Sequence, residues 1–343
     1  DIGRPDQLLM KDPSLVSEAD FLLMESTYGN RNHKGEKESL DELAEAITYS
    51  YQNGEKVIIP AFAVERTQEI LYSLCLLLNS GRLPADMPVY LDSPLAIKAT
   101  EIFRRYHAYL DAQTQELIKK GRDPLRLPNL KMSVSTEDSI RINETREPAI
   151  VISGSGMANA GRIRHHLRHN LWRQGAAIVF VGFQAEGTPG RKIVDGAKKI
   201  RIFNDSVAVA AKVFTINGFS AHAGRDQLLE WLENFQEGRR QVFLVHGEQS
   251  AQDHLAGLIR ERFDLDVVSP EYLEEIVLGE AAEFEKARPA AAPADEPDQL
   301  LGELKAILDE ADTSFKRLRA LPATERAALA RLLNAAARHL DEA

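Results

Sequence analysis

Four short segments of the chain each place a titratable side chain beside small or polar residues. They are Asp1-Ile2-Gly3, Glu25-Ser26-Thr27-Tyr28-Gly29, Phe219-Ser220-Ala221-His222-Ala223 and Val245-His246-Gly247-Glu248. Carboxylate and imidazole groups bind zinc, and they also act as general acids and bases near neutral pH. Such groups could hold metal ions, activate a water molecule and protonate a leaving group. Taken singly, each segment is equally compatible with a solvated carboxylate or a packed histidine.

The elements that must position these segments alternate between strand and helix. Apolar runs predict strands at 19–25, 56–60, 89–91, 148–152, 177–181, 213–216 and 241–245. Helical spacing of apolar residues predicts helices at 36–52, 96–106, 160–171, 225–235 and 250–262, and one that follows the strand at 56–60 and ends at about residue 78. This order predicts an α/β fold with a mainly parallel sheet that is covered on both faces. In such folds the chemistry lies in the loops at the carboxyl ends of the strands.

The composition excludes some classes of protein. Among the 343 residues there is a single cysteine, which excludes a disulfide framework and a cluster of thiolate metal ligands. The chain has no run of about eighteen uncharged apolar residues, so no membrane span is expected and a cytoplasmic protein is the default. It begins Asp1-Ile2-Gly3-Arg4-Pro5, with neither an initiator methionine nor a signal-peptide pattern. We therefore expect it to have been cut from a longer protein.

In their order and separation, the four segments resemble the motifs of metallo-β-lactamase/β-CASP nucleases. In that family the turn at Asp1 corresponds to the fourth metallo-β-lactamase motif, and the turns at Glu25, His222 and His246 correspond to motifs A, B and C. The resemblance extends to about residue 279 and includes 59–66 and 155–162. A histidine in motif C is typical of the RNA-processing members, whereas the DNA-repair members typically carry an apolar residue there.

The resemblance implies a role for each of the four side chains. In this family two zinc ions, typically about 3.5–4 Å apart, clamp a phosphate and ionise a shared water. Asp1 would bridge both ions, and His246 would bind one of them. His222 would act beside the scissile phosphate, and Glu25 would hold the His222 ring in the required tautomer. The implied activity is zinc-dependent hydrolysis of RNA in RNA processing or decay.

The chain departs from the family pattern in one respect. The His-x-His-x-Asp-His motif, which supplies most of the zinc ligands, does not occur in the sequence. Asp1 and His246 alone are too few ligands for a closed tetrahedral site. We therefore expect the N-terminal half of the catalytic domain to be missing and the given chain to be catalytically incomplete. A noncatalytic RNA-binding or scaffold subunit, and a DNA nuclease of the same family, are the alternatives.

A basic region offers a candidate surface for RNA. The net charge is −10, yet residues 160–201 contain nine Lys or Arg and only two acidic residues. Helical spacing places Arg162 and His166 on one stripe, after a turn of small residues that could offer backbone N–H groups to an anion. The residues predicted to bind an RNA phosphate are Ser153, Ser155, Gly156, Arg162, His166 and Ser220. The alternative is a solvated basic helix face that follows a glycine turn.

These expectations define a domain organisation. Residues 1–27 and 205–280 would form a partial metallo-β-lactamase αββα sandwich, and residues 28–204 an inserted β-CASP domain. Residues 281–299, rich in Ala, Pro and acidic side chains, would form a linker. Residues 300–343 show amphipathic helical spacing and would form a helical tail, which is a candidate for association between copies of the chain.

Overall fold

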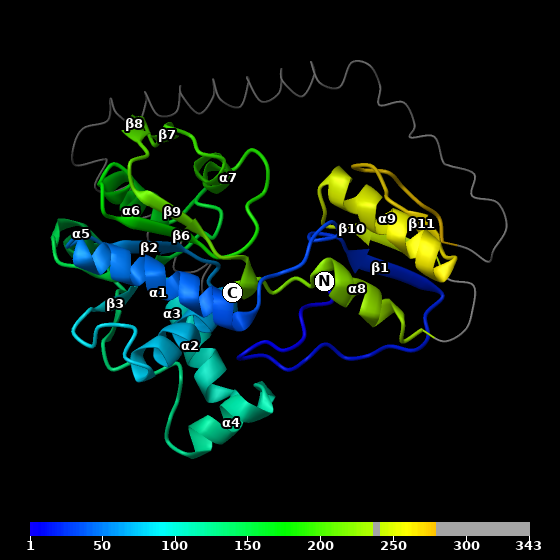
Figure 1. The fold of residues 1–343 in the computed structure, drawn as a ribbon, viewed down its shortest axis with the longest axis horizontal. Helices are drawn as coiled ribbons and strands as arrows, with labels where there is room; N and C mark the ends of the chain where they lie inside the picture. Colours follow the sequence, from blue (N-terminus) through cyan, green and yellow to red (C-terminus); the bar gives the residue numbers. More distant parts are fainter. Residues whose placement is uncertain (236–240, 279–343) are drawn as a thin grey trace, which may run out of the picture. The chain divides into compact units, whose positions relative to one another are not determined.

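The computed structural model describes residues 1–235 and 241–278 (Figure 1). Residues 1–270 form one compact unit, and residues 271–343 are assigned to a second. The expected linker at 281–299 and the expected helical tail at 300–343 lie outside the described residues. In the part of the chain that is described, no helix is both long enough and apolar enough to cross a membrane.

The larger sheet has six parallel strands in the order β4-β3-β5-β2-β6-β9. Their bounds are β2 Val57–Pro60, β3 Val89–Leu91, β4 Leu130–Met132, β5 Ile150–Ser153, β6 Ala177–Phe180 and β9 Lys212–Thr215. Every residue of β2, β5 and β6 is buried. Strands that are buried on both faces carry continuous apolar runs, which explains why the sequence pattern identified them.

Helices cover both faces of this sheet (Figure 1). Their bounds are α1 Glu36–Gln52, α2 Arg66–Asn79, α3 Pro94–Arg105, α4 Ala112–Lys119, α5 Thr136–Glu144, α6 Ile163–Asn170 and α7 Pro189–Val194. Val57 and Ile59 of β2 pack in the core that contains α1 and α2, whereas Ile58 packs in the core that contains α6 and α7. The alternation of side chains along a strand accounts for this division. The predicted α/β fold with a mainly parallel sheet is confirmed.

A smaller sheet positions two of the four motif segments, those that contain Glu25 and His246. Its parallel strands are β1 Phe21–Glu25, β10 Gln241–Val245 and β11 Asp266–Val268, in the order β1-β10-β11. Helices α8 Arg225–Leu232 and α9 Gln249–Phe263 share a buried core with this sheet. Glu25 is paired in register with Val245. The loop that follows Glu25 and the loop that begins with His246 therefore leave the sheet side by side.

Some features were not expected from the sequence. They include α4, β4, α5, α7, β11 and an antiparallel hairpin of β7 Lys199–Ile202 and β8 Asp205–Ala208. Strand β9 pairs with β6 in the larger sheet, so that sheet continues past the boundary expected between residues 204 and 205. The domain limits derived from the sequence remain a proposal.

Candidate active site

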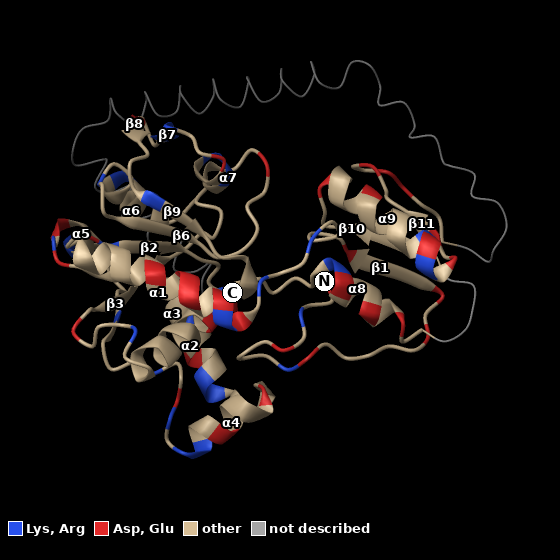
Figure 2. Ribbon diagram, viewed as in Figure 1, with Lys and Arg blue, Asp and Glu red and all other residues tan. Residues whose placement is uncertain are grey.

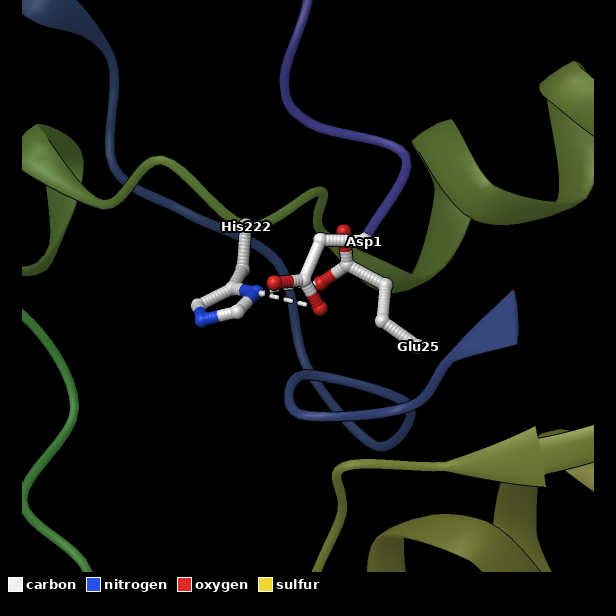
Figure 3. Close-up of side chains that lie close together, drawn as sticks. All are labelled: Asp1, Glu25 and His222. Atoms are coloured by element: carbon white, nitrogen blue, oxygen red, sulfur yellow. Dashed lines mark hydrogen bonds and ion pairs between the residues drawn. The ribbon is translucent and has the colours of Figure 1, made fainter. Parts of the chain in front are cut away.

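Glu25 joins three segments of the chain at the end of β1. Its side chain is completely buried. Oε1 accepts hydrogen bonds from the backbone N–H groups of Ile2, at 2.9 Å, and Gly3, at 3.1 Å. Oε2 lies 2.7 Å from Nδ1 of His222 (Figure 3). Burial alone would raise the pKa of Glu25, but the hydrogen bonds from His222, Gly3 and Ile2 hold it below its ordinary value. The carboxylate is therefore ionised at neutral pH.

This contact fixes the orientation of the His222 ring. Because an ionised carboxylate only accepts hydrogen bonds, Nδ1 of His222 must carry the proton in the bond to Glu25. Within the described part of the chain, Nε2 has no hydrogen-bond partner, and the side chain is 33% exposed. Nε2 is thus the atom that is available to accept or donate a proton. The structure contains the Glu25–His222 contact that the sequence analysis expected; its catalytic role remains a prediction.

Asp1 and His246 form a second pair beside the first. Nδ1 of His246 lies 2.6 Å from Oδ1 of Asp1, and the same oxygen lies 3.8 Å from Nδ1 of His222. Both side chains of the pair are at least half exposed. In Figure 3 the carboxylates of Asp1 and Glu25 point toward the His222 ring. His246 directly follows β10 and has a φ of 59°, a backbone conformation that is uncommon for residues other than glycine.

The chemistry of these groups fits part of a zinc site. Zinc binds carboxylate oxygen and imidazole nitrogen, and Asp1 and His246 offer one of each at close range. Asp1, Glu25 and His222 can each bring a ligand atom within 4.8 Å of the others. Glu25 is the least suitable of the three, because both of its oxygens accept hydrogen bonds inside the protein. Asp1 is therefore a better candidate for a metal ligand than Glu25, and His246 lies beside Asp1.

The small residues of motifs A and C lock the two loops together. Ser26 Oγ donates to the carbonyl oxygen of Val245 at 2.8 Å, and Thr27 Oγ1 donates to that of His246 at 2.6 Å. A Cβ atom added at Gly247 would lie 2.3 Å from Ser26 Oγ and 2.8 Å from its carbonyl oxygen. Only glycine fits at this close approach. The position of the His246 backbone thus depends on contacts made by the loop after β1.

A cavity of about 450 Å³ adjoins these pairs. Its lining includes Asp1 and His222, and also Ser220, which was predicted to bind a phosphate. Phe62, in the turn after β2, and Arg66, the first residue of α2, also line it. The segment that precedes β1 and segments that follow strands of the larger sheet therefore meet at one cavity.

The predicted basic stripe on α6 is wrong in part. His166 is completely buried, with Nε2 2.6 Å from Asp92 Oδ2 and Nδ1 3.0 Å from Asn143 Oδ1. Arg162 donates to Asp92 Oδ1 at 2.8 Å and to the carbonyl oxygen of Ser133 at 3.1 Å. The reason is that one face of α6 packs against the sheet, where His166 and Arg162 both contact the buried carboxylate of Asp92. His166 has no free ring nitrogen for a phosphate in this structure.

In the turn before α6, residues 153–156, some residues are buried and others are partly exposed. Ser153 is buried and donates to the carbonyl oxygen of Asp92 at 2.8 Å, so its hydroxyl has an internal role. Ser155 is partly exposed and lies 2.7 Å from Asn159 Oδ1. Gly156 packs against the Phe62 ring, where an added Cβ would lie 2.7 Å from two ring carbons. Phosphate binding by Ser155 and Gly156 stays a prediction. The other Lys and Arg residues of 160–201 lie on α6, α7 and β7 and in the segments that follow α6 and precede β7 (Figure 2).

Two residues with important contacts were missed from the sequence. Asp92 is buried at the end of β3, and its hydrogen bonds with His166, Ser139 and Ser133 overcome the effect of burial and hold its pKa at about 2. His33 lies with Nε2 2.9 Å from the carbonyl oxygen of His222 and Nδ1 3.1 Å from that of Asn217. Asp92 directly follows the apolar run at 89–91, and this position at a strand end could have identified it as a candidate. For His33 the only signal in the sequence is its nearness to motif A.

The comparisons with known proteins agree with this arrangement. Residues 67–193 match the model of the Beta-Casp domain, and residues 206–270 match that of the Zn-dependent metallo-hydrolase RNA specificity domain. Ribonuclease TTHA0252 of Thermus thermophilus is 41% identical over 249 residues, which are 73% of this chain and 56% of the relative. Transcription termination factor FttA of Methanocaldococcus jannaschii is 33% identical over 263 residues, 74% of this chain and 41% of the relative.

A third relative comes from the same archaeon. The RNase J-like protein of Methanocaldococcus jannaschii is 33% identical over 236 residues, 68% of this chain and 53% of the relative. The chain spans about half the length of the curated relatives it matches. Both matched domains, the three relatives and the four motif loops point to one assignment. The chain belongs to the metallo-β-lactamase/β-CASP family.

Proposed function

We propose that the whole protein is a zinc-dependent ribonuclease that hydrolyses phosphodiester bonds of RNA in RNA processing or decay. The observation that carries the proposal is the Glu25–His222 pair beside Asp1 and His246, next to a cavity. The match to an RNA specificity domain and the name of the ribonuclease relative support RNA as the substrate. The noncatalytic scaffold gains no support from this geometry, because it does not require an oriented His222 ring.

Asp1 and His246 would hold zinc, and two ions are proposed on the family pattern. When bound, zinc neutralises charge on a phosphate and supplies a water that is ionised at neutral pH. His222 would donate a proton from Nε2 to the oxygen that leaves as the phosphodiester bond breaks. The ionised Glu25 stabilises the protonated ring and prevents it from turning. A cytoplasmic location and association between copies of the chain are further parts of the proposal.

The test is cleavage of a labelled single-stranded RNA by the whole protein loaded with zinc, beside DNA of the same sequence. His222→Ala should lower the single-turnover rate by roughly 10²- to 10⁴-fold, the usual contribution of a general acid, with zinc content unchanged. His254→Ala is the matched control, because His254 is an exposed histidine on α9 and should leave the rate unchanged.

Three outcomes would count against the proposal. Intact RNA after incubation with the zinc-loaded protein would favour a scaffold function. Equal cleavage of RNA and DNA would contradict the assignment to the RNA-processing branch. A His222→Ala variant that is unstable but cleaves normally in its folded fraction would mean that His222 only packs in its loop.

A further inference from the structure

Arg66 is a buried cation that faces the cavity. It is the first residue of α2, it is 8% exposed, and it lines the same cavity as Asp1 and His222. Within the described part of the chain, its guanidinium group makes no hydrogen bond and no ion pair within 4 Å. Arginine keeps its charge in proteins, and a buried charge without a direct partner is costly. Among the described residues, no guanidinium nitrogen of Arg66 belongs to the buried polar atoms that lack a partner, so the charged end of the side chain is open to the cavity and available to an anion.

The surroundings of Arg66 do not supply a direct partner. Burial lowers the pKa of its guanidinium group, and the carboxylates of Glu69 and Glu65 counteract this effect. Glu69 is itself buried, one of its carboxylate oxygens has no hydrogen-bond partner, and burial raises its pKa. The positive charge of Arg4, a second buried arginine, lowers the pKa of Arg66 further. Glu69 thus offsets the charge of Arg66 only in part and from beyond ion-pair distance.

The turn that precedes Arg66 adds an aromatic surface to the same cavity. Phe62 lines the cavity, and its side chain is 49% exposed. The ring is held from one side by Gly156. Arg66 is the one Lys or Arg among the residues that line this cavity. The cavity therefore offers a cation that can bind a phosphate and, one short turn away, an exposed aromatic ring that can stack on a base.

We propose that Phe62 and Arg66 form a nucleotide subsite beside the cleavage site, in which Arg66 binds an RNA phosphate and Phe62 stacks on a base. This inference rests on the proposed ribonuclease function. The planar guanidinium fork matches two phosphate oxygens, which supplies the direct partner that Arg66 lacks inside the protein. Every base has a flat face that can stack on an aromatic ring, so the subsite accepts RNA of any sequence.

Binding of a short single-stranded RNA to the whole protein tests the role of Arg66, in a His222→Ala background in which cleavage is expected to be slow. Arg66→Gln should weaken binding roughly 10- to 100-fold, the loss expected for a charge-assisted hydrogen bond. The slope of log affinity against log salt should become shallower by about 0.7, because one phosphate contact is lost. Arg66→Lys should keep the slope and lose only part of the affinity. The control is Arg82→Gln, an exposed arginine paired with Asp41, which should change neither quantity.

A purely structural role for Arg66 is tested with a double variant. If Arg66 only offsets the charge of Glu69, then Arg66→Gln/Glu69→Gln should restore both the melting temperature and the RNA affinity. If Arg66 binds phosphate, the double variant should regain stability while its RNA affinity stays low. Recovery of both would overturn the inference, as would an unchanged salt slope in a folded Arg66→Gln variant.

The role of Phe62 is tested with an RNA that lacks single bases. Phe62→Leu should weaken binding of the intact RNA roughly 5- to 100-fold, in line with the contribution of one stacked base. Removing the base that stacks should abolish this difference between the variant and the starting protein. An equal loss with every RNA would refute stacking. If the protein with His222 intact cleaves no RNA but the Arg66 and Phe62 variants bind RNA more weakly, the proposed ribonuclease function is contradicted and the nucleotide subsite is not.

Discussion

Glu25→Gln is the substitution that most directly tests the acid–base pair. The amide has the shape of the carboxylate, but it has one acceptor oxygen where Glu25 has two. Oε1 of Glu25 accepts two backbone N–H groups, so the amide oxygen of glutamine should take that position. The amide NH₂ group then faces Nδ1 of His222. Because two donors cannot share this contact, the neutral ring must move its proton to Nε2.

The size of the effect follows from the burial of Glu25 and the length of its contacts. The charge-assisted hydrogen bond between Glu25 and His222 is replaced by a neutral one, which should lower the free energy of unfolding by about 1–1.5 kcal/mol. Solvent screens little of this loss, because Glu25 is completely buried. The imidazolium form of His222 loses its counter-charge, and we expect the cleavage rate to fall roughly 10- to 100-fold. This is a milder loss than that from His222→Ala, since the ring remains in place.

The assay compares Glu25→Gln, His222→Ala and His246→Ala in the whole protein. Zinc content, melting temperature and single-turnover rate are measured for each variant. His246→Ala should lose zinc and activity together, whereas the other two should keep zinc and lose rate. The reasoning is refuted if Glu25→Gln cleaves RNA at the wild-type rate, or if His222→Ala loses as much zinc as His246→Ala.

Three further predictions concern stability. Asp92→Asn should lower the free energy of unfolding by about 3–5 kcal/mol in urea titrations, because it breaks a buried charge pair. Burial lowers the pKa of Lys56 to about 8, whereas lysine in the unfolded chain titrates near about 10.4. The unfolded chain therefore binds more protons between these values, so the free energy of unfolding should rise with pH in this window, and Lys56→Met should lack the rise. Gly247→Ala should destabilise by about 1–3 kcal/mol through its clash with Ser26, whereas Gly257→Ala, with no atom within 4 Å of the added Cβ, should stabilise α9 slightly when melting temperatures are compared.

The sequence predicted the strands best where both faces are buried. The runs at 57–60, 150–153 and 177–180 are entirely buried and, apart from Ser153, apolar, so their pattern is unambiguous. Strand β4 was missed because it has three residues, none of them buried, and lies at the edge of the larger sheet. The β7–β8 hairpin has only four residues per strand; β7 alternates exposed and buried residues, whereas β8 has a single buried one, so the pattern is too short to separate from a loop.

The candidate site could be predicted only as far as local sequence carries the information. The family motifs supplied Glu25 with His222 and Asp1 with His246, and the structure places each pair in contact. Helical spacing, however, does not tell which face of α6 packs against a sheet, so His166 was predicted to be exposed. The burial of Arg66 depends on how α2 packs against segments distant in the sequence, such as the one containing Arg4. Such packing leaves no periodic trace in the sequence.

The position of His222 relative to Arg66 depends on the segments that join the two sheets. His222 follows β9 of the larger sheet along the chain yet contacts Glu25 of the smaller one, while Arg66 begins helix α2, which packs on the larger sheet. His33 lies against the segment after β9, with one ring nitrogen near the carbonyl oxygen of Asn217 and the other near that of His222. Because catalysis requires the reacting groups to be held in a fixed geometry, these contacts matter although the His33 side chain does not line the cavity. The geometry of the candidate site is thus set as much by the segments that connect the sheets as by the four motif residues.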